Sequence, residues 1–367
     1  MADRPADKSQ PFPLPPELLV KVLNEIDSWE DIKALLLVYR GFYEAMMTLL
    51  SEWVTVSNYE ESLNQLEKIS DFPRVALNVG ILQCAMIALD TACVKDPVRW
   101  EMWWSNMSEV GLAPEKLADV DFKEQTFWKY QELCCNNVLN SPRYLRRFIE
   151  VMRQMPNIKA LLYATEHFSS DRHTPQFHHG MLDLEDFVNL WQDGSSPWRL
   201  MVLTIRAASS AHLKIEQFDI QQTFKSTFGD LLGDMGATTG IPYRLLTDAS
   251  EQDFEHMRNV FRGLKNLTLR ISVHTEEQID ELLEDSRVCL AQGPAKLAEL
   301  LCCIESLEKI YLRANNEDSF KPPLLDLGTI LPPLNHRGWP LQRFYLCGMA
   351  VSAPGAIVDS LRAAQLV

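Results

Sequence analysis

The sequence lacks the short motifs that mark the common enzyme classes. It has no G-x-S-x-G nucleophile elbow, no H-E-x-x-H zinc motif and no G-x-x-x-x-G-K-[ST] phosphate loop. The C-x-x-C pair is also absent, although the chain contains eight cysteines. These absences leave hydrolytic, nucleotide-dependent and paired-cysteine zinc chemistry without support. We therefore expect a protein that is not an enzyme and that needs no cofactor.

Positive charge is scarce. The 367 residues include 35 Lys and Arg against 50 Asp and Glu, which gives a formal net charge of −15. Nucleic acids and anionic membranes are bound mainly through Lys and Arg side chains that neutralise phosphates. We therefore expect no nucleic acid and no membrane among the partners of this protein.

Long apolar runs are lacking as well. The first ten residues, MADRPADKSQ, contain no apolar core of a secretory signal. The most apolar long run, residues 75–89, includes polar residues and is shorter than the roughly 20 residues of a membrane span. The sequence thus predicts a soluble protein of the cytoplasm or nucleus, whose cysteines are buried thiols and not disulfides.

One stretch near the start of the chain holds more apolar residues than it can bury alone. The segment 11–53 reads PFPLPPELLVKVLNEIDSWEDIKALLLVYRGFYEAMMTLLSEW. Its apolar residues at 18, 19, 22, 23 and 26 have the spacing of one helical face. Ser28 and Asp31 have the spacing of a capping box and predict a second helix. So short a segment cannot enclose this much apolar surface, which must contact the rest of the chain or another protein.

The order of motifs in this stretch resembles an F-box of the fungal type. The resemblance rests on LPxELLxxVL at 14–23, DIxxL at 31–35 and VYRxF at 38–42. It implies a helical domain that docks on a Skp-family adaptor and, through it, on a cullin. The docking residues that it implies are Leu14, Pro15, Leu18, Leu19, Leu23, Ile32, Leu35, Leu36, Val38 and Phe42. The alternative is an ordinary helical hairpin at the start of an all-helical domain.

The next part of the chain, residues 55–140, is predicted to be a helical linker. We expect helices at 63–69, 81–92 and 123–138. Trp100 and Trp104 are one helical turn apart and share a face, with Trp103 beside them. Such a cluster favours a hydrophobic core over a ligand-binding cage.

A repeated step, apolar-x-x-apolar-x-apolar, begins at residue 158. It occurs at 158–163, 215–220, 264–269, 307–312 and 341–346. Helix-like runs precede four of these steps, at 143–154, 198–208, 251–262 and 295–305, and Gly263 is a stop signal for the third run. A short strand after each helix predicts an irregular α/β array.

This array resembles the degenerate leucine-rich repeats that often follow an F-box, and an unrelated α+β domain is the alternative. We therefore expect an α/β fold, α+β overall. It would comprise a disordered tail at 1–12, a helical F-box-like domain at 13–54, a helical linker at 55–140 and an irregular leucine-rich-repeat-like solenoid at 141–367.

The resemblance implies a substrate receptor of an SCF-type cullin-RING ubiquitin ligase. Such a receptor performs no chemistry, holds a target protein that the sequence does not identify, and could use the insertions at 164–200, 221–250 and 313–340 for recognition. An F-box scaffold that works outside a ligase is a second possibility.

A metal-dependent hydrolase is the alternative from another class. Its candidate ligands are the imidazoles of His167, His173, His178 and His179. Their spacings of 6, 5 and 1 differ from the tighter pairs that are usual in local zinc motifs, such as H-x3-H on one helix face or C-x2-C. The spacing therefore favours a polar surface loop, and we assign no metal ligand.

Overall fold

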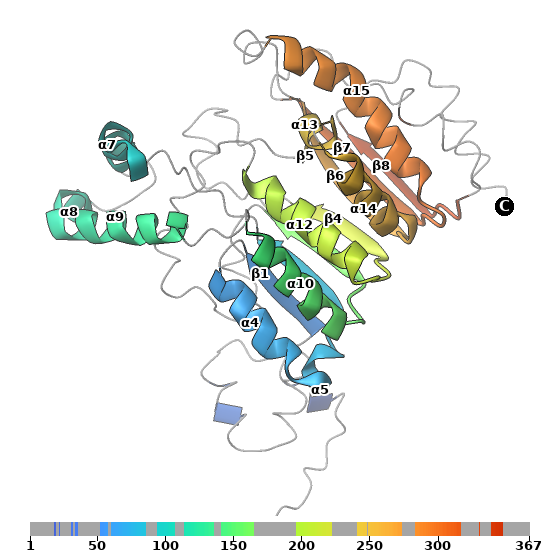
Figure 1. The fold of residues 1–367 in the computed structure, drawn as a ribbon, viewed down its shortest axis with the longest axis horizontal. Coiled ribbons are helices and arrows are strands. Elements are labelled where there is room, and N and C mark those ends of the chain that lie inside the picture. The colour runs from blue at the N-terminus through green and yellow to red at the C-terminus, as the bar shows by residue number, and fades with distance from the viewer. Residues whose placement is uncertain are drawn as a thin grey trace, which may run out of the picture.

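The computed structural model describes residues 18–19, 22, 31, 34–35, 52–57, 60–85, 94–106, 114–135, 141–164, 196–221, 241–247, 249–273, 283–316, 330 and 339–347. Eight strands in these ranges form one parallel sheet (Figure 1). The strands are β1 (Trp53–Ser57), β2 (Ile81–Ala85), β3 (Ala160–Ala164), β4 (Gln217–Gln221), β5 (Ile241–Pro242), β6 (Asn266–Val273), β7 (Lys309–Asn316) and β8 (Arg343–Cys347).

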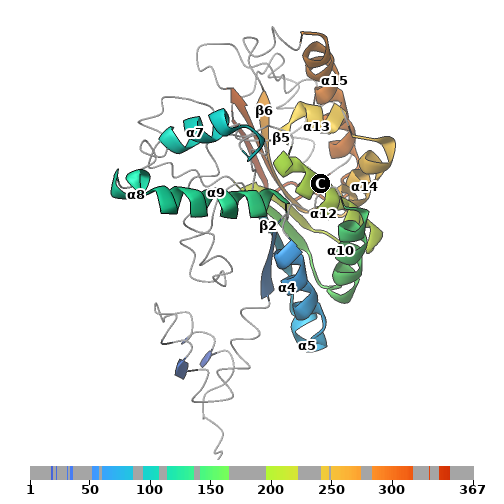
Figure 2. The ribbon, with the colours of Figure 1, turned by 60° about the vertical axis from the view of Figure 1, so that its left-hand side comes forward.

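The strands follow one another across the sheet in the order β1-β2-β3-β4-β6-β7-β8, and the short β5 also pairs with β6. Helices line one face of the sheet in a row that runs the same way (Figures 1 and 2). They are α4 (Glu60–Ser70), α5 (Pro73–Ala76), α10 (Pro142–Gln154), α12 (Ser196–Ser210), α13 (Tyr243–Thr247), α14 (Glu251–Arg262) and α15 (Leu283–Cys302). A helix therefore leads into each of β2, β3, β4, β6 and β7.

One apolar row crosses the whole sheet on its helix-covered face. Its members are partners in register from β1 to β8, and all but the last are buried: Val54, Leu82, Leu161, Phe218, Leu267, Ile310 and Phe344. The last five are the middle apolar residues of the five repeated steps. The predicted strands are thus confirmed, and the steps occupy equivalent positions in one sheet.

The predicted helix at 81–92 is wrong at 81–85, where the chain forms β2. A strand that is covered on both faces has nearly continuous apolar residues, which periodicity alone does not separate from a helix. Val79, Leu82 and Cys84 in fact repeat the apolar step of the later strands, and all three are buried. Because β1 lies at 53–57, the sheet begins well before residue 141.

The helix predictions at 63–69, 143–154, 198–208 and 251–262 are confirmed by α4, α10, α12 and α14. The predicted helix at 295–305 is the last part of α15, which ends at Cys302. The predicted helix at 123–138 corresponds to α9 (Val120–Cys135), and residues 136–138 lie outside the described ranges.

A ladder of alternating charge runs along the sheet just before the strands. Each backbone N–H group on this line donates to the carbonyl oxygen of the equivalent residue in the preceding repeat, at 2.7–2.8 Å. The donor and acceptor pairs are Lys159 to Gly80, Glu216 to Lys159, Lys265 to Glu216 and Glu308 to Lys265. The side chains alternate in sign along this line. Lys265 Nζ lies 3.0 Å from Glu216 Oε2, and Lys159 Nζ lies 4.0 Å from Glu216 Oε1. The hydrogen bond from Lys265 lowers the pKa of Glu216.

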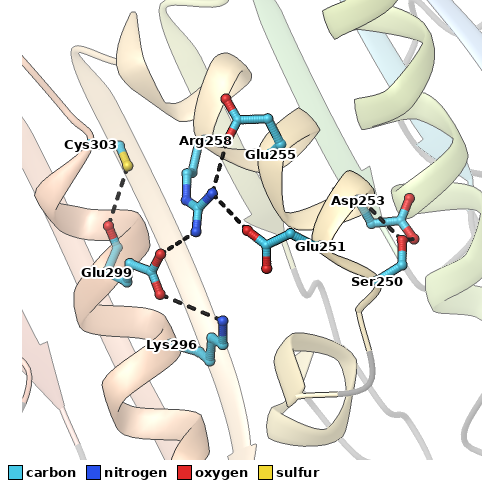
Figure 3. Close-up of polar contacts among 8 residues, drawn as sticks. All are labelled: Ser250, Glu251, Asp253, Glu255, Arg258, Lys296, Glu299 and Cys303. Atoms are coloured by element: carbon cyan, nitrogen blue, oxygen red, sulfur yellow. Dashed lines mark hydrogen bonds and ion pairs between the residues drawn. The ribbon is translucent and has the colours of Figure 1, made fainter.

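Arginine side chains connect neighbouring helices on the outside of the array. Arg147 of α10 donates to Glu67 and Glu60 of α4. Arg206 of α12 donates to Asp253 of α14. A similar contact joins α14 to α15, where Arg258 lies between Glu251, Glu255 and Glu299 (Figure 3). Each of these pairs thus fixes one helix against the next.

Helices α7 (Pro97–Asn106), α8 (Pro114–Ala118) and α9 lie apart from this row, toward the other side of the sheet (Figure 2). Trp100 of α7 packs on Phe127 of α9 with ring centroids 5.0 Å apart, and Trp104 lies 6.0 Å from Phe122. Trp100 and Trp104 are both buried. The prediction of a tryptophan core is confirmed for these two residues.

No disulfide joins the cysteines that the structure describes with their side chains. Cys84 is fully buried, and its Sγ lies 3.3 Å from Thr204 Oγ1. Because the Thr204 hydroxyl donates to the Leu200 carbonyl oxygen, the Cys84 thiol is the donor of the first contact. Burial raises the pKa of Cys84 to about 12, so this thiol is neutral, as predicted.

Candidate protein-binding face

The second face of the sheet carries polar and aromatic side chains on its last described strands. Alternate residues of a strand point to opposite faces. With Ile310 and Leu312 in the core, Lys309, Tyr311 and Arg313 of β7 point away from the helices. Their register partners on β8 are Arg343, Tyr345 and Cys347, and Arg313 also pairs with Arg270 of β6.

Two tyrosines form the centre of this face. Tyr311 and Tyr345 are register partners, and their rings stack with centroids 4.4 Å apart and planes inclined by 6°. The spacing follows from the sheet, because adjacent strands lie about 4.8 Å apart. Tyr345 is 50% exposed. The inner faces of the two stacked rings cover each other, so the pair offers ring edges and hydroxyl groups to a ligand above the sheet.

Basic side chains lie on both sides of the tyrosine pair. Lys309 and Arg343 are exposed and lie on one side, and the half-buried Arg313 lies on the other. Within the described part of the chain, none of these three side chains forms an ion pair of 4.0 Å or less. No Asp or Glu occupies a position on this face of β6, β7 or β8. An acidic protein thus presents a locally basic surface.

The Tyr345 phenol does not reduce this positive charge. The neighbouring Tyr311 and then Cys347 raise the pKa of Tyr345 above its ordinary value. The Tyr345 hydroxyl is therefore neutral at physiological pH and does not offset the charge of the Lys and Arg side chains. We refer to the residues Arg270, Lys309, Tyr311, Arg313, Arg343 and Tyr345 as the basic face.

On the same side of the sheet, the side chains of β1, β2 and β3 at the other end are less exposed. Trp53 Nε1 of β1 donates to Gln83 Oε1 of β2 at 2.6 Å. Gln83 is fully buried, and Ala160 and Leu162 of β3 are also buried. Exposed side chains on this side of the sheet are therefore found on β7 and β8, and binding of a partner is expected there.

Three of the predicted docking residues for an adaptor lie in the described part of the chain. Leu18 is helical and 42% exposed, Leu19 is buried with 4% exposed, and Leu35 is half-buried. Val22, one turn after Leu18, is 39% exposed. The other seven docking residues lie outside the described ranges: Leu14, Pro15, Leu23, Ile32, Leu36, Val38 and Phe42.

The four histidines of the metal alternative also lie outside the described residues. Within those that are described, no three His, Cys, Asp or Glu side chains are grouped so that they could hold a metal ion. In the same ranges, no helix has the length and apolar content that a membrane crossing requires.

Comparisons of the chain with protein-family models, with curated proteins and with solved structures found no match. Sequence reasoning did not single out the basic face. Its residues fill the variable positions of the repeated step, and their only signal is that Lys309, Tyr311 and Arg313 alternate with buried residues of one strand.

Proposed function

We propose that this protein is a substrate-recognition subunit of an SCF-type cullin-RING ubiquitin ligase. In this proposal the N-terminal helices form an F-box that docks on a Skp-family adaptor, and the sheet belongs to an irregular leucine-rich-repeat-like solenoid. The basic face holds the target protein, in the cytoplasm or nucleus. The protein performs no chemistry and places the target close to a ubiquitin-charged conjugating enzyme, which raises the effective concentration of the reacting groups.

The observation that carries this proposal is the order of the sheet. Strands that pair in near chain order, with helices before β2, β3, β4, β6 and β7 on the same face, are the arrangement of a repeat array. Such arrays bind partners over an extended surface on the strand side. Here the array follows a segment with the motif order of an F-box, and this combination favours a receptor over an isolated enzyme domain.

The exposure pattern of the first helix supports a docking role. Leu18 and Val22 share one helical face and are both exposed. Leu19, on another face, is buried. A helix of an adaptor-binding domain needs both kinds of residue, because one face holds the domain together and the other contacts the partner.

Co-purification with a Skp-family adaptor tests the proposal. The full chain is co-expressed with the adaptor, and is compared with the double variant Leu18→Asp, Val22→Asp. The matched control is Val98→Asp, Met102→Asp, since these residues of α7 are also one turn apart and are 66% and 58% exposed. We expect the first pair to abolish the complex and the control to retain it, with equal melting temperatures for both variants.

Two results would count against this function. If the unaltered chain is soluble and does not bind the adaptor, the N-terminal segment is an ordinary helical hairpin. If adaptor binding is intact but the complex recruits no cullin, the protein is an F-box scaffold that works outside a ligase. Sedimentation of the purified adaptor complex with and without cullin separates these cases.

A further inference from the structure

We propose that the basic face binds an extended acidic peptide segment, in which an aromatic or apolar side chain has a carboxylate two residues before it and another two residues after it. That this segment belongs to a ubiquitination target rests on the function proposed above. The binding itself rests only on the geometry of β7 and β8.

The spacing along β7 defines the first part of this motif. Lys309, Tyr311 and Arg313 are alternate residues of one strand, so neighbouring members of the trio are separated by about 6.6 Å. A peptide in extended conformation presents its own alternate side chains at the same interval. A peptide that runs along β7 can therefore place two carboxylates over Lys309 and Arg313 and the side chain between them over Tyr311.

Strand β8 reinforces the same pattern. Arg343 is the register partner of Lys309, and Tyr345 is the partner of Tyr311. The first carboxylate thus meets two cations, of which the arginine can bind it through two parallel hydrogen bonds. The central side chain meets the edges of two parallel, stacked rings, and an aromatic or apolar group placed over these edges is favoured because ring edges pack well against an aromatic face.

The charge distribution favours a peptide over a nucleic acid. The basic face is a small region of a chain whose formal net charge is −15. A polyanion that extends beyond this region is repelled by the rest of the surface, and nucleic-acid affinity depends on many phosphate contacts. A short acidic segment gains the local attraction and contacts little of the acidic surface.

Fluorescence anisotropy with short labelled peptides tests the motif. The probe carries the core Glu-Ser-Phe-Ser-Glu, and the control peptides carry Gln-Ser-Phe-Ser-Gln and Ser-Glu-Phe-Glu-Ser. The last peptide has the same composition and charge with the carboxylates moved next to the aromatic residue. We expect the probe to bind at least about tenfold more tightly than either control, because neither control can place carboxylates over the cations on both sides of Tyr311. We also expect the affinity to fall as salt is raised from 50 to 300 mM.

Variants of the protein locate the site. We expect Lys309→Glu with Arg343→Glu to weaken binding of the probe at least about tenfold, and Tyr345→Ala to weaken it about fivefold through the lost aromatic contact. The control is Arg74→Glu with Arg146→Glu, which changes net charge equally at exposed positions on α5 and α10. This control should leave affinity within about twofold.

Four outcomes overturn the inference. Equal binding of the glutamine peptide removes the role of charge, and equal binding of the rearranged peptide removes the register with β7. Tighter binding of single-stranded DNA of the same charge assigns the face to nucleic acid. Dimerisation that is lost in Tyr345→Ala, measured by sedimentation, assigns it to a second copy of this chain. Adaptor co-purification is independent of all four, so failure of this inference and failure of the proposed function are separable.

Discussion

The backbone at Gly263 passes so close to Ile215 that a Cβ atom at position 263 would lie 3.0 Å from the Ile215 carbonyl oxygen. Gly263 follows α14 and has φ of −88°, which any residue can adopt. The glycine that the sequence marks as a helix stop is therefore required for a different reason. It lets the start of one repeat approach the start of the preceding repeat.

We expect Gly263→Ala to lower the free energy of unfolding by about 1–3 kcal/mol, because neither backbone can move away cheaply. Gly80→Ala is the matched control. Its Cβ would lie 3.9 Å from the Glu52 carbonyl oxygen, an ordinary contact. Urea denaturation should show a clear loss for the first variant and a change within about 0.5 kcal/mol for the second. Equal effects would mean that the close approach at Ile215 is not what requires glycine.

Arg147→Ala should destabilise the fold more than Lys123→Ala. Arg147 donates to Glu60, Asn64 and Glu67, and its loss leaves partly buried acceptors without a donor. A cost of about 1–3 kcal/mol is typical of such a loss. Lys123 pairs with Glu101, whose side chain is 62% exposed, and exposed pairs contribute about 0–1 kcal/mol. Thermal unfolding of both variants under one buffer condition measures the difference.

The contact between Glu67 and Arg147 should make stability depend on acid pH. The hydrogen bond from Arg147 lowers the pKa of Glu67 from its ordinary value of 4.5. The ionised carboxylate therefore stabilises the fold at pH values above 4.5, and this contribution is lost as the pH falls through the lowered pKa. We expect wild type to be more stable than Glu67→Gln at pH 7, with a difference that shrinks toward pH 3. A difference independent of pH would contradict the ion pair.

Cys84 should resist thiol reagents in the native state. It is fully buried and its pKa is raised to about 12, so almost no thiolate is exposed to a reagent at pH 8. Cys347 is half-buried on β8 and serves as the internal comparison. Brief treatment with a maleimide, followed by peptide mass mapping, should show label at Cys347 and none at Cys84. Label at both only after addition of urea would confirm that burial is the cause.

The sequence predicted most of the sheet because its strands repeat one apolar pattern after helices of clear periodicity. That pattern predicts strands at Leu161, Phe218 and Leu267, and these residues are partners in one row. The pattern failed at Ile81–Ala85, where apolar residues fit a helix and a strand equally well. Strand β2 could have been found by comparing Val79-x-x-Leu82-x-Cys84 with the later steps.

The basic face could not be predicted in the same way. Tyr311 and Tyr345 are far apart in the chain, and their stacking depends on the register of β7 against β8. That register follows from long-range packing, which no local window contains. The adaptor-binding prediction remains a prediction, because most of its residues lie outside those described.

The alternating ladder also bears on how the chain avoids mispairing while it folds. Repeats of similar pattern can pair out of turn, with one strand skipped. Such an error would bring Lys159 beside Lys265, or Glu216 beside Glu308, in place of the opposite charges that are neighbours in the native order. Like charges side by side are unfavourable. The alternating charges therefore favour the native order of the repeats. Pairing that skips a strand is disfavoured as soon as two repeats come into contact.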